Sequence, residues 1–253
     1  MAITILTSCL NIWDKDENDV RYPHVMGNEN GILDVLNQHI KKYDNFLFVA
    51  SVADAPDITD VYAKATIEAI DMTMPFQKYS VLDGRNASEA KRLIQDADFI
   101  ILTGGHVPSQ NKFFAECGLF ELLNNCSAVV LGISAGTMNL ARQVYSPPEL
   151  DGEYLDKDFE RFFPGVGRTN INVFPHYDEL YDSYLDGVHV MSEIVKPDSF
   201  KTPVLCMNNG TYVEIVDDVA TLRGEAYLME NGDFSQVCKN DESIDVTYLH
   251  LGK

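Results

Sequence analysis

The fold of this chain is decided by the stretch "SAVVLGISAGTMNLARQVY", residues 127–145. Residues 127–134 form an apolar run, which is typical of a strand buried on both faces of a parallel sheet. Residues 135–145 then have the length and spacing of a helix. Small residues stand on both sides of Ser134, where the predicted strand passes into the predicted helix. Either they let the helix pack tightly on the sheet, or they form a sharp turn that displays the serine.

The same alternation of apolar strands and longer helical segments extends outward from this stretch. It predicts an α/β protein with a mostly parallel sheet that is flanked by helices on both faces. The strands are expected at residues 3–6, 45–53, 78–83, 99–105 and 127–134. The intervening helices are expected at residues 30–43, 56–73, 86–98 and 108–125.

The pattern changes in the C-terminal third of the chain. A predicted strand at residues 169–175 and a helical stretch at 177–195 are followed by short strand-like runs with tight turns between them. These runs predict a short antiparallel extension of the sheet edge at the C-terminal end. Because no segment has the composition of a linker, residues 1–253 are predicted to form a single α/β domain.

Composition excludes several classes of function. The net charge of −20, from 39 acidic and 19 basic residues, predicts repulsion of nucleic acids and of anionic membranes. No apolar stretch approaches the roughly 20 residues that span a bilayer, and the first residues lack the pattern of a signal peptide. Five scattered cysteines without a C-x-x-C pair predict neither disulfides nor a zinc site. We therefore expect a cytoplasmic protein without a metal or an organic cofactor.

The turn at residues 132–136 has the pattern G-x-S-x-G of a nucleophile elbow. In a parallel sheet, ligands bind beyond the carboxyl ends of the strands, and Ser134 lies at such an end. The elbow places the backbone amide of Ala135 at the start of a helix, where it is suited to stabilise an oxyanion. Gly104 and Gly105 end the neighbouring predicted strand and offer further amides, unless they only form a sharp turn.

A serine nucleophile needs a base, which is usually histidine. His176 is favoured among the six histidines because it directly follows a predicted strand on the edge that carries Ser134. His250, near the C-terminus, is the alternative if the chain is an ordinary α/β-hydrolase, in which the histidine follows the last strand. His106 follows the glycine pair and is a candidate for contact with substrate.

The third member of a triad is a carboxylate that orients the imidazole. The segment 145–163 supplies six acidic residues, so the composition alone does not single one out. Two prolines precede Glu149 and restrict the backbone that leads to it. Glu149 is therefore the first choice for the acid of the triad, and Asp151 is the second.

Three motifs in this order resemble the peptidase E and cyanophycinase family of serine peptidases. They are "ILTGGH" at residues 101–106, "VVLGISAGTMNLA" at 129–141 and "INVFPHYDE" at 171–179, and the resemblance covers roughly residues 98–215. It implies a flavodoxin-like α/β fold similar to that of the class I glutamine amidotransferases, with serine in place of their cysteine. It also implies hydrolysis of small peptides, either with release of an N-terminal aspartate or, as in cyanophycinases, at β-linked Asp-Arg units.

The resemblance also assigns roles to residues. Ser134 matches the nucleophile, His176 matches the base, and Gly105 and Ala135 match the positions whose amides form the oxyanion hole. In the peptidase E branch the acid lies about fifteen residues after the serine, which is Glu149 here, where the dipeptidase has aspartate.

The cyanophycinase branch takes its acid from a later strand end. The corresponding stretch here is "VLCMNNGTYVEI", residues 204–215, which has Asn208 and Asn209 where an acid is expected. Because asparagine cannot stabilise an imidazolium by charge, the comparison favours the peptidase E branch.

The sequence therefore predicts a serine peptidase that cleaves short peptides, including those with N-terminal aspartate, through an acyl-enzyme intermediate. Two departures from the family leave the substrate side chain open: His106 replaces a small or amide side chain, and the loop between Ser134 and His176 has a different length. An esterase that uses His250 and a catalytically inactive homologue that binds a small ligand are the alternatives. A monomer and a homodimer are both compatible with the sequence.

Overall fold

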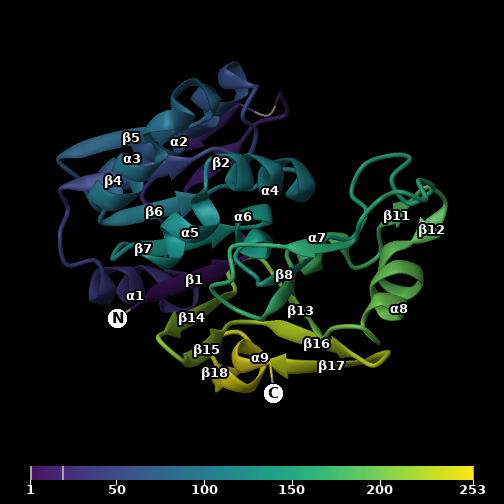
Figure 1. The fold of residues 1–253 in the computed structure, drawn as a ribbon. Helices are drawn as coiled ribbons and strands as arrows, with labels where there is room; N and C mark the ends of the chain where they lie inside the picture. The colour runs from purple at the N-terminus through teal and green to yellow at the C-terminus, as the bar shows by residue number, and fades with distance from the viewer. Residues whose placement is uncertain (1, 19, 253) are drawn as a thin grey trace.

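An eight-stranded sheet forms the centre of the protein (Figure 1). The computed structural model describes residues 2–18 and 20–252. The parallel half of the sheet contains, in spatial order, β5 (Lys78–Leu82), β4 (Asn45–Val49), β6 (Phe99–Leu102), β7 (Val129–Ile133) and β1 (Ile3–Thr7). Beyond β1 the sheet continues through three antiparallel strands, β14 (Tyr212–Val216), β15 (Val219–Arg223) and β18 (Ser243–Asp245). The predicted mostly parallel α/β fold is confirmed.

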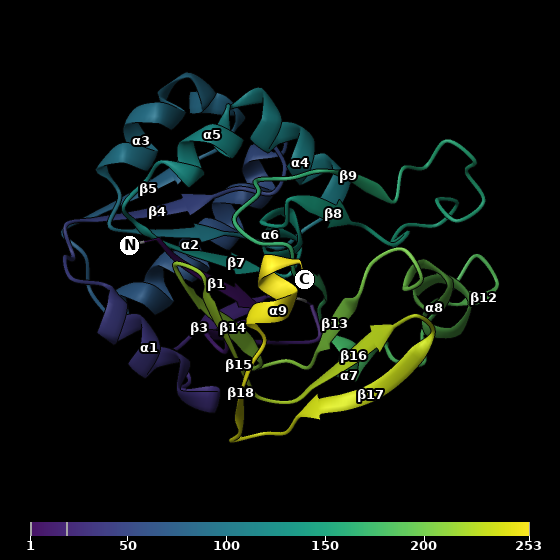
Figure 2. The same cartoon turned by 60° about the horizontal axis from the view of Figure 1, so that its bottom comes forward.

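Helices cover both faces of this sheet, so its central strands are buried. In Figure 2, α3 (Ala90–Asp96), α4 (Val107–Glu116) and α5 (Leu119–Asn124) lie on one face, and α1 (Ile32–His39) lies on the other. All residues of β1 and β6 are buried, and burial on both faces explains why β6 is a continuous apolar run in the sequence; β1 combines three apolar residues with Thr4 and Thr7. No helix in the described part of the chain is long and apolar enough to cross a membrane.

A short hairpin that the sequence analysis did not predict follows β1. It consists of β2 (Trp13–Lys15) and β3 (Arg21–Pro23), and it packs against α2 (Pro56–Thr73). The ring of Trp13 meets that of Tyr62 edge to face, with centroids 6.4 Å apart. The hairpin therefore places side chains over the carboxyl ends of the strands, at the edge where ligands bind in this kind of sheet.

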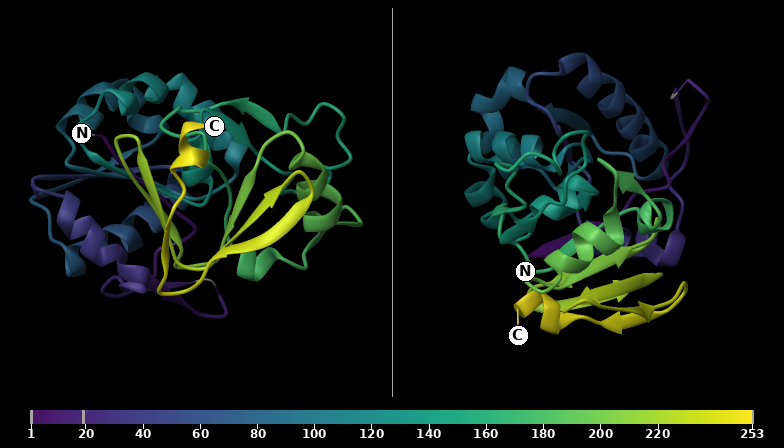
Figure 3. Two further views of the ribbon diagram at one scale, coloured as in Figure 1. Left: turned by 90° about the horizontal axis from the view of Figure 1, so that it is seen from below. Right: turned by 90° about the vertical axis from the view of Figure 1, so that its right-hand side faces the viewer.

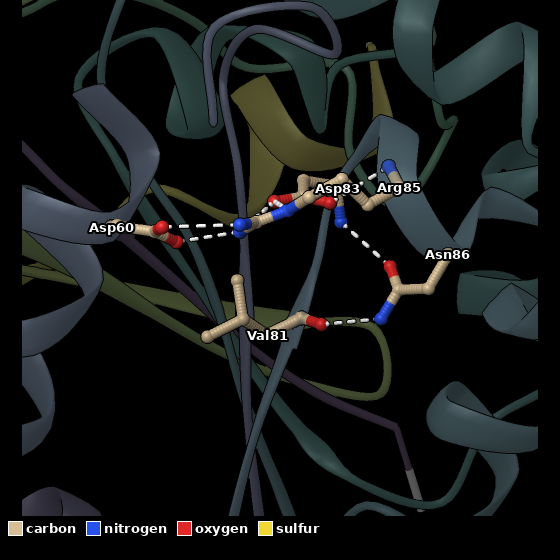
Figure 4. Close-up of polar contacts among 5 residues, drawn as sticks. All are labelled: Asp60, Val81, Asp83, Arg85 and Asn86. Carbon is tan, nitrogen blue, oxygen red and sulfur yellow. Dashed lines mark hydrogen bonds and ion pairs between the residues drawn. The ribbon is translucent and has the colours of Figure 1, made fainter. Parts of the chain in front are cut away.

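A clamp, formed by Arg85 between the carboxylates of Asp60 and Asp83, connects α2 to the turn after β5 (Figure 4). The guanidinium of Arg85 contacts Asp60 of α2 at 2.5 Å and the buried Asp83 at 2.6 Å. The amide of Asn86 completes the turn, since its Nδ2 donates to the carbonyl of Val81 at 2.8 Å. These contacts fix the end of β5 relative to the helix that borders the site.

The C-terminal strands are divided between two sheets, which corrects the prediction of one continuous extension. Three of them extend the main sheet, whereas β13 (Val204–Met207), β16 (Ala226–Glu230) and β17 (Asp233–Cys238) join β10 (Asn172–Phe174) in a four-stranded sheet. Gly224, at φ +97°, lies between β15 and β16, where the chain leaves the main sheet. Figure 3 shows these yellow and green strands on the opposite side of the protein from the blue helices α2 and α3.

Two predicted helices are shorter than expected because strand pairing interrupts them. The helix expected at 135–145 is α6 (Ala135–Asn139), after which β8 (Gln143–Tyr145) pairs with β9 (Phe162–Pro164). The helix expected at 177–195 is α7 (Tyr177–Leu180), after which β11 (Tyr184–Leu185) and β12 (Val188–His189) form a hairpin. A π-helical segment, η3 (Val190–Val195), follows.

Candidate active site

The turn between β7 and α6 holds Ser134 in a strained backbone conformation. Its φ and ψ are +51° and −114°, which a non-glycine residue rarely adopts. A Cβ on Gly132 would lie 2.6 Å from the Cα of Thr137, and one on Gly136 would lie 2.1 Å from the carbonyl oxygen of Leu102. The small residues thus serve both purposes considered from the sequence: they allow close packing, and they form a sharp turn that carries the serine.

The glycine pair after β6 lies directly beside this serine. A Cβ on Gly104 would be 3.3 Å from the Cβ of Ser134, so the backbone of the pair borders the predicted nucleophile. Gly105 has φ +152°, and a Cβ there would lie 2.6 Å from the side chain of Ser51. Both geometry and space therefore require glycine at position 105.

His176 is held at the end of β10 by contacts with two other strand ends. Its backbone is left-handed, with φ +55°, and its N–H donates to the Oγ of Ser8, which follows β1, at 2.6 Å. Its Nδ1 lies 2.7 Å from the Oδ1 of Asn209, which follows β13. The second ring nitrogen, Nε2, is the atom available to act as a base.

Ser134 and His176 line one cleft of about 640 Å³, together with Gly105 and Asn209. The other walls come from the segment after β1, the β2–β3 hairpin and α2. The structure thus brings the predicted nucleophile, the predicted base and the predicted glycine of the oxyanion hole together at the carboxyl edge of the sheet.

Charged side chains of both signs line this cleft. Lys15 and Arg21 come from the hairpin, and the Arg21 guanidinium lies 3.8 Å from the centroid of the Tyr62 ring. Glu29 and Glu179 line the same cleft. The cleft of this protein of net charge −20 is therefore lined by two cations on the hairpin and two carboxylates from other elements.

Glu149 does not make the contact with His176 that was predicted for it, because Asn209 occupies that position. The backbone N–H of Glu149 donates to Glu153 at 2.8 Å, and neither Glu149 nor Asp151 is among the described residues that line the cleft. The loop that carries both acids is bound to the β11–β12 turn instead. The carboxylate of Asp186 in that turn accepts hydrogen bonds from the backbone N–H groups of Gly152 and Tyr154.

The carboxyl of Glu149 has an altered acidity. Its pKa is raised to about 7, first because burial removes water from the carboxyl and second because of the nearby Glu153 charge. A hydrogen bond from the Val107 amide lowers the pKa by a smaller amount. The residue as a whole is still reached by solvent.

His106 faces the same loop and is not among the described residues lining the cleft. Its Nε2 lies 2.8 Å from the Oε1 of Glu153, and its Nδ1 lies 2.7 Å from the Oγ of Ser109. His106 therefore contacts the loop that the sequence analysis had searched for the acid.

His250 lies in a different part of the protein. It is buried on α9 (Thr247–Leu251), its Nδ1 is 3.1 Å from the Oγ1 of Thr169, and burial lowers its pKa. It lines a separate cavity of about 330 Å³ that does not contain Ser134. The histidine required by the esterase alternative is therefore absent from the cleft of the serine.

Sequence reasoning missed several residues of this site, among them Ser8, Glu179 and Arg21. Ser8 and Glu179 support His176 and Asn209 from elements distant in the sequence, and Arg21 comes from the unpredicted hairpin. Asn209 stands at the strand end where the resemblance placed an acid, and this was the one signal that pointed to it. The described residues contain no group of three histidine, cysteine, aspartate or glutamate side chains that could hold a metal ion.

An elbow serine and a histidine that share one cleft at the carboxyl edge of a parallel sheet define a serine hydrolase of the α/β type. The sequence model of peptidase family S51 matches residues 25–223. The chain belongs to peptidase family S51, and it is a serine peptidase.

The fold is similar to that of a candidate peptidase E protein from Listeria monocytogenes EGD-e. The TM-score is 0.56 and the identity 14%, and the similarity covers 94% of this chain and 99% of that chain. At this identity the similarity shows the fold alone. A comparison with curated protein sequences gave no match.

Proposed function

We propose that this peptidase hydrolyses short peptides through an acyl-enzyme formed on Ser134. The observation that supports the proposal most directly is the strained elbow, which displays Ser134 in the cleft that also holds His176. The Ser134 Oγ would attack the scissile carbonyl carbon while the Nε2 of His176 takes the hydroxyl proton. The amides of Gly105 and Ala135 would bind the oxyanion of the tetrahedral intermediate.

The amine product then leaves, and water hydrolyses the acyl-enzyme. Protonated His176 gives its proton to the leaving amine, the C–N bond breaks, and the acyl group remains on Ser134. Water then attacks the ester with His176 again as base. His176 returns this proton to the Ser134 Oγ as the ester C–O bond breaks, and the carboxylic acid is released.

The charges of the cleft support a substrate with an acidic N-terminal residue, as in Asp-X dipeptides. Arg21 and Lys15 are suited to the side-chain carboxylate, and Glu29 is suited to the α-ammonium group. Hydrogen bonds to charged groups contribute about 1.5–3 kcal/mol each, so we expect Asp-X to be preferred over Ala-X by roughly ten- to a hundred-fold in kcat/KM.

The proposal is tested by measuring hydrolysis of Asp-X, Glu-X, Ala-X and β-Asp-Arg dipeptides and labelling by a fluorophosphonate. Hydrolysis and labelling should both be lost in Ser134→Ala. His176→Gln should inactivate the enzyme, whereas His250→Gln should leave kcat/KM unchanged; the reverse result would restore the esterase alternative. A folded wild-type protein that neither hydrolyses any dipeptide nor reacts with the probe would be a binding homologue, and the proposal would be wrong.

A further inference from the structure

The residue that contacts His176 is itself held by two carboxylates of α7. The Nδ2 of Asn209 donates to the Oε1 of Glu179 at 2.6 Å, and its backbone N–H donates to the Oδ1 of Asp178 at 3.0 Å. The Oδ1 of Asn209 then lies 2.7 Å from the Nδ1 of His176. A carboxylate, an amide and an imidazole thus form one chain of hydrogen bonds that ends in the cleft.

The chemistry of these groups allows only one direction of donation along this series of hydrogen bonds. An ionised carboxylate only accepts hydrogen bonds, so Glu179 must face the NH₂ group of Asn209 and not its carbonyl oxygen. The carbonyl oxygen must then face His176, and because it only accepts, Nδ1 must carry the ring proton. The Nε2 lone pair is left toward the cleft, which is the tautomer that a general base requires.

We infer that Glu179, acting through Asn209, fixes the tautomer and the orientation of His176, so that an amide held by a carboxylate takes the place of the acid of a serine triad. For its catalytic consequence the inference rests on the proposed function. Neither Asn209 nor Glu179 touches the reacting atoms in this scheme, and both are positioning residues.

The arrangement also places negative charge near the imidazole without direct contact. The pKa of the Cys9 thiol, which lines the same cleft, is raised to about 11. Burial is the largest cause, the Gly210 amide lowers the pKa, and the charges of Asp178, Glu179 and Glu29 contribute to the rise. This end of the cleft is therefore electronegative, which favours the imidazolium that forms when Ser134 loses its proton.

A first experiment reads the tautomer without relying on activity. Two-bond ¹H–¹⁵N correlation spectra of ¹⁵N-histidine protein are recorded above the pKa of the ring, with the His176 signals assigned from His176→Gln. The wild type should show Nδ1–H. In Glu179→Gln, whose amide can donate as well as accept, and in Asn209→Leu, a population with Nε2–H should appear. Nε2–H in the wild type, or unchanged populations in both variants, would overturn the inference.

A second experiment measures the pH dependence of kcat/KM for the best dipeptide. Asn209→Leu should lower kcat about a hundredfold or more, and Glu179→Gln about tenfold, with folding checked by circular dichroism. Asn209→Asp places a carboxylate directly on the imidazole and favours its charged form, so the ascending limb should move to higher pH by about one unit or more. Rescue of activity by Asn209→Asp at high pH, relative to Asn209→Leu, is a result that loss of packing alone would not give.

A matched control uses a carboxylate–amide pair outside the cleft. The Nε2 of Gln77 donates to the Oδ1 of Asp44 at 2.7 Å, just before β4, at the opposite edge of the sheet. Asp44→Asn should leave the His176 signals and the kinetics unchanged.

The two proposals fail in distinguishable ways. If wild-type Ser134 reacts with substrate and probe but the Asn209 and Glu179 variants keep wild-type spectra and pH profiles, only the inference about positioning is wrong. If Glu179 controls the tautomer but no substrate or probe reacts, the inference stands and the proposed peptidase activity is wrong.

Discussion

A Cβ atom on Gly136 would lie 2.1 Å from the carbonyl oxygen of Leu102. The first turn of α6 therefore rests directly on the backbone at the end of β6, with no side chain between them. Since Leu102 leads into the glycine pair and Gly136 follows Ser134, this one contact fixes the distance between Ser134 and the backbone amides beside it.

Gly136→Ala should therefore damage both stability and activity. Overpacking of this kind costs about 1–3 kcal/mol, and the shift of α6 against β6 should lower kcat much more than it raises KM. Urea denaturation and steady-state kinetics measure the two effects. Gly118→Ala is the control, because its Cβ would meet open space; it should cost about 1–2 kcal/mol for its left-handed backbone and leave kcat unchanged. Wild-type kcat in Gly136→Ala would contradict the role of the contact.

The raised pKa of Glu149 predicts a dependence of stability on pH. Its pKa is about 7 in the folded protein, above the ordinary value, so the unfolded chain loses this proton first as the pH rises. The free energy of unfolding should therefore fall between about pH 4.5 and pH 7, by a modest amount because solvent reaches the residue.

Glu149→Gln should flatten this part of the profile and stabilise the protein above pH 7, as measured by urea midpoints at each pH. Glu160→Gln, which changes an exposed carboxylate of the same loop, should leave the slope in place. If the two variants change the profile equally, the pH dependence has another source.

Arg21→Gln should weaken the preference for acidic substrates. It removes from the cleft the guanidinium that lies over the Tyr62 ring and leaves a shorter polar side chain, so folding is checked by circular dichroism. We expect KM for Asp-X to rise about tenfold or more, with a smaller change for Ala-X. Arg92→Gln, on the exposed side of α3, is the control. An unchanged ratio of Asp-X to Ala-X would show that Arg21 does not recognise the carboxylate.

The clamp around Arg85 predicts different costs for its two carboxylates. Asp83 is buried and accepts hydrogen bonds from the backbone and the side chain of Arg85, so Asp83→Ala should cost roughly 1–3 kcal/mol in thermal or urea unfolding. Asp60 is exposed on α2 and meets the same guanidinium, so Asp60→Ala should cost much less. Equal losses would show that burial does not decide the strength of these contacts.

Much of the fold could be predicted because its signals are local. A strand buried on both faces is mostly apolar, and β6 and β7 carry that signal in the sequence. The elbow is similar, since the close approaches of Gly132 and Gly136 leave no space for a larger residue. The helix after it was overestimated because the end of α6 is set by a partner distant in sequence: the N–H of Arg142 donates to the carbonyl of Thr169.

The partner of His176 could not be predicted in the same way. Six acidic residues follow the elbow, and nothing in their spacing says which of them approaches an imidazole. The residue that does so, Asn209, is uncharged and was set aside for that reason. Its role depends on Glu179, which lies 30 positions earlier in the chain. Such a relation exists only after β10 and β13, the strands that precede Glu179 and Asn209, have paired in the four-stranded sheet.

The surroundings of His176 have a consequence for synthesis on the ribosome. Its backbone is held by Ser8, 168 positions earlier, and its ring by Asn209, 33 positions later. Because chains emerge from the N-terminus, Ser134 is made well before Asn209, the residue that contacts the His176 ring. The complete cleft can therefore assemble only after more than four-fifths of the chain has been translated.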